Sequence, residues 1–256
     1  MEDIAAVRCP SILVLGDSHV RAFSGSASFL PVFLGPGKEN CFLDDQRSEN
    51  LKCKLSDVLD VVHRANILLV LGEPDSRFYL GYGWYPWKVM REGEGVKVSA
   101  TMRRGIEASA RRYCELLDLI AHRETNTYAV LSVIPTERKI QNHLAGMFND
   151  ILRHACKQRN ICFVDICADL VNHLGELDVT FRLDPVHLNT KIQRLVAARF
   201  HECSSLHSSS DAGSVLKICE YEPKHGCYVL RKRRRNAASK VRSGWQSLFK
   251  KWRTEM

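Results

Sequence analysis

The stretch SILVLGDSHVRAF, residues 11–23, joins an apolar run to the beginning of a helix through Gly16, Asp17, Ser18 and His19. A short run that is apolar at every position is typical of a strand buried on both faces of a sheet. Ser18 stands where this strand gives way to the helix. In that place a serine either caps the helix or acts as a nucleophile held at the carboxyl-terminal edge of the sheet.

The same alternation of apolar strand and amphipathic helix continues along the chain. We expect strands over 11–16, 29–35, 66–73, 127–135 and 161–166, and helices over 51–65, 102–122, 137–160 and 188–200. This order predicts a parallel sheet covered by helices on both faces. Ligands of such sheets bind beyond the carboxyl-terminal ends of the strands, where Ser18, Gly35 and residues 73–77 would lie.

The charge of the chain is concentrated at one end. Residues 217–256 carry 12 Lys and Arg against 3 Asp and Glu, whereas the first 216 residues carry 25 against 26. The Ser-rich stretch SSLHSSSDAGS, residues 204–214, has the composition of a linker. We therefore expect an α/β domain over 1–203, a linker over 204–216 and a basic amphipathic tail over 217–256.

The chain shows no sign of secretion or membrane insertion. No apolar run approaches the ~20 residues of a membrane span, and the first residues lack the basic start and apolar stretch of a secretory signal. The ten cysteines are scattered, with no Cys-x-x-Cys pair and no zinc-site spacing. We expect reduced cysteines that pack as small apolar side chains, no metal, and a cytoplasmic protein.

Asp184 and His187 lie three residues apart in FRLDPVHLNT, with Pro185 holding the turn between them rigid. This spacing lets a carboxylate orient a histidine from the same loop. A general base needs such a partner, because its imidazole must keep one tautomer and carry a transient positive charge. With Ser18 after the first strand, we expect Ser18 as nucleophile, His187 as general base and Asp184 as its orienter.

These residues, in this order, resemble the SGNH (GDSL-like) hydrolase family. The resemblance extends over about residues 11–200 and includes Gly35 after the second strand and Gly72 after the third. It implies a three-layer α/β/α sandwich with a central parallel sheet, similar to flavodoxin, and a triad that needs no cofactor. It also implies that the backbone N–H groups of Ser18 and Gly35, with a side-chain donor from the end of the third strand, hold the oxyanion of the transition state.

The stretch after the third strand departs from the family pattern. The family has Gly-x-Asn-Asp there, and its Asn donates to the oxyanion, whereas this chain has Gly72-Glu73-Pro74-Asp75-Ser76-Arg77. Ionised Glu73 and Asp75 cannot donate a hydrogen bond. Arg77 either supplies a cationic donor, held by the two carboxylates, or forms a purely structural ion pair with them. Gly-Asp-Ser-His with Gly-Glu-x-Asp-x-Arg resembles a subgroup linked to bacterial polysaccharide biosynthesis.

Aromatic residues follow directly, in RFYLGYGWYPWK at residues 77–88. Tyr82 and Trp84 of this stretch either stack on sugar rings, wall an acyl pocket, or belong to a lid that packs on the body. His19, beside Ser18, is expected in the wall of the site or at the helix start and not as a catalyst.

The end of the chain has the pattern of a basic amphipathic helix. KVRSGWQSLFKKW, residues 240–252, places Val241, Trp245, Leu248, Phe249 and Trp252 at helical spacing. Such a helix fits an anionic membrane surface, while nucleic-acid binding by the RKRRR run and a solvated tail are the alternatives. We favour docking of residues 231–256 on the inner membrane over nucleic acid.

The triad pattern predicts a serine-dependent O-acyl ester hydrolase that acts on an acylated carbohydrate, whether a small molecule or a glycan. One alternative is an acyltransferase that uses acetyl-CoA or another acyl-CoA in polysaccharide biosynthesis. The other is a catalytically silent SGNH scaffold that binds a glycan or a protein.

Overall fold

The computed structural model of the chain describes residues 12–34, 45–71, 100–136, 139–184, 187–203, 211–223 and 226–230. Within these ranges the strands are β1 Ile12–Gly16, β2 Phe29–Phe33, β3 Asn66–Val70, β4 Thr127–Leu131, β5 Cys162–Val164, β6 Cys219–Glu222 and β7 Cys227–Leu230. The helices are η1 Ser18–Phe23, α1 Asp45–Leu59, α3 Ala100–Ala121, α4 Lys139–Gln158, α5 Cys167–Leu170, α6 Ile192–Cys203 and η3 Ala212–Lys217, where η marks a 3-10 helix. The strands and long helices predicted from the sequence in these ranges are confirmed.

The described strands form one sheet in the order β5-β4-β3-β1-β2-β7-β6. All neighbouring pairs are parallel except β6 with β7. β1 lies near the centre, with β2 and β3 on either side. Because the carboxyl-terminal ends of β1 to β5 lie at one edge, residues that follow these strands meet there.

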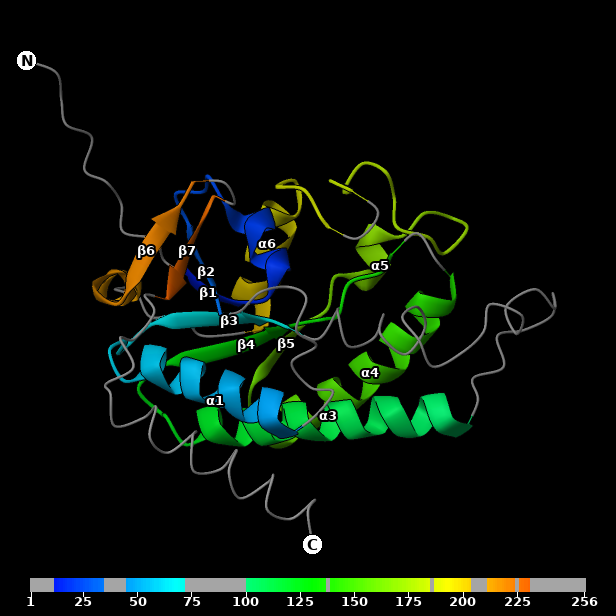
Figure 1. Cartoon of the computed structure of the whole chain (residues 1–256). Helices are drawn as coiled ribbons and strands as arrows, with labels where there is room; N and C mark the ends of the chain where they lie inside the picture. Colours follow the sequence, from blue (N-terminus) through cyan, green and yellow to red (C-terminus); the bar gives the residue numbers. More distant parts are fainter. Residues whose placement is uncertain are drawn as a thin grey trace, which may run out of the picture.

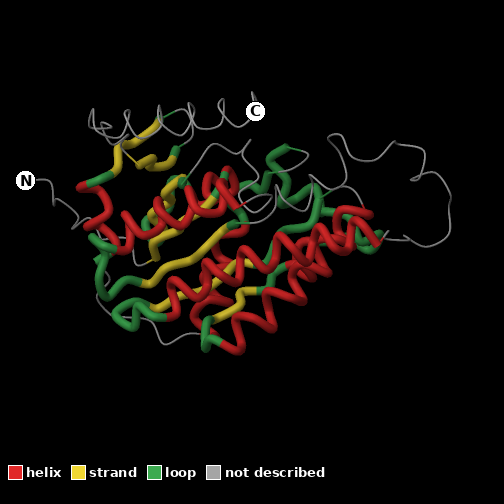
Figure 2. Tube along the Cα trace, turned by 60° about the horizontal axis from the view of Figure 1, so that its bottom comes forward, coloured by secondary structure: helices red, strands yellow, loops and turns green. Residues whose placement is uncertain are grey.

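The central strands β1 and β3 are buried on both faces, as their apolar sequences predict. In β1, Leu13 and Leu15 join the core beneath α1, α3 and α4, whereas Ile12 and Val14 join the core beneath η1 and α6. This alternation follows from the two-residue period of a strand. Figure 1 shows the resulting layers, with α1, α3 and α4 on one side of the sheet and α5 and α6 on the other. In Figure 2, where the bottom of Figure 1 comes forward, helices (red) lie over the strands (yellow). The expected three-layer α/β/α sandwich is confirmed.

The expected end of the α/β domain at residue 203 is wrong, because residues 211–223 and 226–230 are part of that domain. Ala212 and Val215 of η3 are fully buried in the larger core, and β7 pairs with β2, so this part of the chain completes the sheet. The strongly basic residues that follow it, from Arg231 on, hid the signal, which is a Pro- and Gly-containing turn between the two short runs CEYE and CYVL. Residues 204–210 and 231–256 lie outside the described residues, as does the predicted membrane-docking helix.

The expectation that all the cysteines are reduced is also wrong for one pair. Cys162 of β5 and Cys203 at the end of α6 form a disulfide, with their Cα atoms 5.8 Å apart. The sequence could not show this pair, because its members are 41 residues apart and only the packing of α6 against the edge strand brings them together.

In the described part of the chain, no helix is long and apolar enough to cross a membrane.

Candidate active site

Ser18 is the first residue of η1 and lies directly beyond the carboxyl-terminal end of β1. Gly16, two residues earlier, allows the end of β1 to approach β3 closely. A Cβ atom at this position would overlap the carbonyl oxygen of Val70 on β3, which also accepts the backbone N–H of Asp17 at 3.1 Å. The Asp17 carboxylate then accepts the N–H of His19 at 3.0 Å and caps η1. Asp17, and not Ser18, is therefore the cap, which leaves the Ser18 hydroxyl for another role.

Asp184 and His187 are joined twice within their own loop. One carboxylate oxygen, Oδ2, accepts from Nδ1 of the His187 ring at 2.7 Å, and the other, Oδ1, accepts the backbone N–H of His187 at 2.8 Å. The imidazole is half-buried, with 19% of its side chain exposed, whereas the Asp184 side chain is 45% exposed. Since both oxygens bind the same residue, the carboxylate fixes the ring orientation and its tautomer together.

The triad is completed across 169 residues of sequence. Nε2 of His187 lies 3.0 Å from Oγ of Ser18. A carboxylate cannot donate, so Nδ1 carries the proton that binds Asp184, and Nε2 is the acceptor of the Ser18 hydroxyl proton. This is the arrangement in which a histidine removes a proton from an attacking serine.

The imidazole of His19 lies beside this triad. It is buried, and its ring centroid is 5.1 Å from that of His187, with the two planes tilted by 40°. His19 is thus both a neighbour of the triad histidine and the second residue of η1.

Asn189, which sequence reasoning missed, holds the loop before the triad histidine. Its side-chain amide donates to the carbonyl of Thr180 at 2.9 Å and, more weakly, to that of Arg182 at 3.4 Å, while its backbone N–H donates to Phe181 O at 2.8 Å. The buried Leu188 anchors the same loop in the core beneath α6. The only hint in the sequence is an Asn two residues after the histidine, which by itself indicates nothing.

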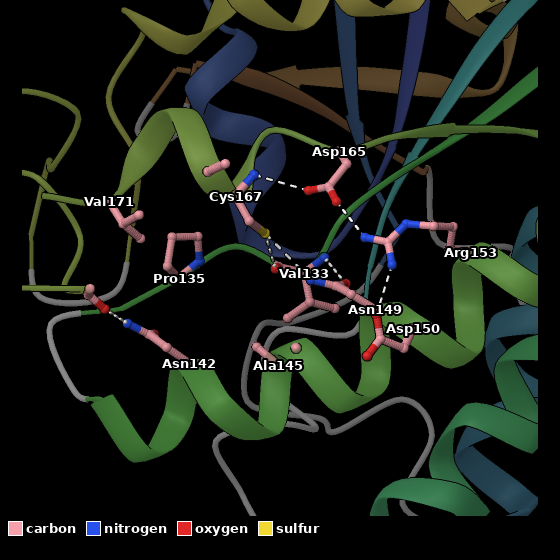
Figure 3. A pocket seen from close by; sticks show the side chains of 13 residues that line it. Val133, Pro135, Asn142, Ala145, Asn149, Asp150, Arg153, Asp165, Cys167 and Val171 are labelled. Carbon is pink, nitrogen blue, oxygen red and sulfur yellow. Dashed lines mark hydrogen bonds and ion pairs between the residues drawn. The ribbon is translucent and has the colours of Figure 1, made fainter. Parts of the chain in front are cut away.

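A separate cavity of about 320 Å³ lies where β4 and β5 end, between α4 and α5, and none of the triad residues lines it (Figure 3). Its polar side chains bind one another. Arg153 bridges Asp150 and Asp165, and Asn149 pairs with both backbone groups of Val133.

Three ionisable groups of this cavity, Arg153, Asp165 and Cys167, have shifted pKa values, and two of these shifts bear on its chemistry. Burial raises the pKa of the Cys167 thiol to about 12, so this cysteine is protonated and is not a competing nucleophile. Burial also acts to raise the pKa of Asp165, but hydrogen bonds from the Cys167 N–H and from Arg153 outweigh it and hold that pKa below its usual range.

The remaining site residues predicted from the sequence are Gly35, Gly72, Glu73, Asp75, Arg77, Tyr82 and Trp84, and all lie outside the described residues. The donors of the oxyanion hole therefore stay a prediction. In the described ranges, no group of three or more His, Cys, Asp or Glu side chains is placed to hold a metal ion.

No protein-family model matches the chain, and no curated protein matches it in sequence. Several solved structures, in contrast, are similar to the chain in structure. A Streptococcus pneumonia protein, described as a platelet activating factor, superposes with a TM-score of 0.50 at 15% identity, over 78% of this chain and 86% of that one. The chain shares its fold. An acetyl xylan esterase matches at a TM-score of 0.49, with 15% identity over 76% of this chain and 100% of that one. A GDSL-like lipase from Bacteroides thetaiotaomicron matches at 0.47, with 12% identity over 75% and 85%.

Proposed function

We propose that the protein is a serine-dependent O-acyl ester hydrolase of the SGNH type. The observation that carries this proposal is the hydrogen-bonded chain from Ser18 through His187 to Asp184, with distances of 3.0 and 2.7 Å. A serine that only capped its helix would bind a backbone N–H, a role that Asp17 fills here. The order of the three residues along the chain and their places in the fold are those that the family resemblance implies.

The geometry supports a two-step reaction. Ser18 Oγ attacks the acyl carbonyl carbon while His187 Nε2 takes its proton, and Asp184 stabilises the resulting imidazolium. The imidazolium then protonates the departing alkoxide oxygen, which leaves the acyl group on Ser18. Water attacks this ester and gives its proton to Nε2, which passes a proton to the departing Ser18 oxygen, so that the carboxylic acid and the free serine are released.

We further propose an acylated carbohydrate as the substrate. Support comes from the sequence, in which the aromatic stretch with Tyr82 and Trp84 follows the third strand directly. Aromatic faces bind the apolar faces of sugar rings, and a loop after β3 begins at the same sheet edge as Ser18.

Acyl transfer to a glycan is a second candidate, because the same acyl-enzyme can react with a sugar hydroxyl in place of water. It is favoured by Pro74, which replaces the Asn that donates to the oxyanion in ordinary esterases of this family. Mass spectrometry of glycan acceptors after incubation with acetyl-CoA distinguishes the two, since only transfer adds an acetyl group to the acceptor.

The test of the triad uses the full chain and a fluorophosphonate probe, which reacts with activated serines. The wild type should be labelled at Ser18 and should hydrolyse a short-chain aryl ester. Ser18→Ala should lose both, while Ser28→Ala, which changes an exposed serine in the loop between η1 and β2, should keep both. A wild type that is neither labelled nor active would refute the proposal in favour of a silent scaffold.

A further inference from the structure

Gln193 of α6 reaches the segment that carries the nucleophile. Its side-chain Nε2 donates to the carbonyl oxygen of Ala22 at 2.9 Å and to that of Ser24 at 3.0 Å. These partners are 171 and 169 residues away in the sequence. One amide group therefore binds two carbonyls at the end of η1.

These carbonyls need a partner from outside their own helix. η1 ends at Phe23, and the last bond of its ladder runs from Ser24 N to Arg21 O. The carbonyls that follow have no intrahelical donor, as at every helix end. Ala22 is buried, so water is a poor substitute there, and the Gln193 amide supplies the missing donors.

The two elements that Gln193 joins carry the two halves of the triad. η1 begins with Ser18, and α6 begins five residues after His187. Apolar side chains of both, such as Val20 and Ile192, share one core, but such packing has no direction and tolerates small shifts of one helix along the other. Hydrogen bonds to two carbonyls define the position along the helix, because they lengthen as soon as either element slides.

We propose that Gln193 is a positioning residue that sets the Ser18 Oγ to His187 Nε2 separation by holding η1 against α6. The inference rests on the proposed hydrolase function. Gln193 affects the distance between Ser18 and His187. It does not affect the pair of Asp184 and His187, because that pair lies within its own loop.

The test compares three substitutions of this residue. Gln193→Met keeps the length and removes both donors, Gln193→Glu places oxygens against the carbonyls, and Gln193→Lys restores a donor on a side chain of similar length. We expect kcat for a small aryl ester to fall about tenfold in the Met variant and further in the Glu variant, because a misplacement of a fraction of an ångström weakens proton transfer. The Lys variant should recover to within about threefold of wild type.

Two further measurements separate positioning from general damage. KM and the pH at which fluorophosphonate labelling is half-maximal should stay at wild-type values in the Met variant, because the substrate site and the His187 pair are untouched. Gln158→Met is the matched control, since it removes an exposed glutamine amide of α4 whose one hydrogen bond within the described residues is to His154. If the Met variant fails to fold, the comparison of Lys with Glu carries the same test.

The inference is overturned if Gln193→Met matches Gln158→Met in kcat, if Lys fails to recover activity, or if the loss comes with a shifted pH midpoint. A wild type that the probe does not label refutes the proposed hydrolase itself. The two failures are therefore distinguishable.

Discussion

Replacement of Asp184 by Asn should impair the enzyme more than replacement by Ala. In the wild type, both oxygens of the carboxylate accept from His187, one from Nδ1 and one from the backbone N–H. An amide has only one oxygen. Because the backbone group can only donate, it takes that oxygen, and the NH2 of Asn faces Nδ1. The ring then accepts at Nδ1 and carries its proton on Nε2, where it can no longer take the proton of Ser18.

The magnitudes follow from the geometry. Ala removes the attraction between the carboxylate and the transient imidazolium, which is about 4 kcal/mol at an effective dielectric constant of 20 and about 1 kcal/mol in water. With 45% of the Asp184 side chain exposed, an intermediate value of about 2–3 kcal/mol applies. This corresponds to a loss of roughly 30- to 150-fold in kcat. Asn must in addition break a hydrogen bond or oppose two donors to recover the correct tautomer, which costs about 1–3 kcal/mol more.

The assay is kcat for a short-chain aryl ester, with thermal melting of each variant as the control for folding. Nitrogen-15 NMR of the His187 ring reports the tautomer without reference to activity, and the proton should move from Nδ1 in the wild type to Nε2 in Asp184→Asn. An Asn variant as active as the Ala variant, or a ring that keeps its proton on Nδ1, would refute the reasoning.

Three further outcomes are expected for stability. Gly16→Ala should destabilise the fold by about 3 kcal/mol or more, because the added methyl group would overlap a backbone oxygen. Gly146→Ala, where the added methyl group meets open space on α4, should stabilise the fold by about 0.5–1 kcal/mol. Chemical denaturation measures both changes, and similar effects of the two substitutions would contradict this expectation. Reduction of Cys162–Cys203, or Cys203→Ser, should cost about 4 kcal/mol, the loop entropy of some 40 residues, and an unchanged melting temperature under reducing conditions would exclude the effect. The lowered pKa of Asp165 stabilises the fold above the unfolded value near pH 4, and this stability is lost as the pH falls through the folded pKa. Between pH 6 and pH 3, the melting temperature of the Asp165→Asn variant should therefore fall less than that of the wild type. An equal fall in both proteins would show that the ionised Asp165 does not stabilise the fold.

The sequence was most informative where structure is local. The uniformly apolar run before Gly16 predicts a buried strand wherever it lies in the sheet, because burial of both faces leaves no polar position. The spacing of three residues from Asp184 to His187 allows their contact within a single turn. Both expectations needed only neighbours in the chain, and the described structure has both features.

Long-range contacts were beyond such reasoning. The pairing of β7 with β2, the disulfide between Cys162 and Cys203 and the bond from Gln193 to Ala22 each join segments that nothing in local periodicity relates. The residues that make these contacts are also of ordinary types for a strand or a helix, so no sequence pattern distinguishes them from their neighbours.

The sequence by itself determined the order of strands and helices and the chemical types at the site, because hydrophobic period and short motifs are properties of neighbouring residues. The motifs predicted that Ser18 meets His187, but only the tertiary structure brings the two side chains together. Their 3.0 Å contact depends on β1 lying near the centre of the sheet and on the packing of α6 against η1. That packing is a sum of many weak apolar contacts and two directional hydrogen bonds from Gln193, and it exists only once the layers of the fold have assembled.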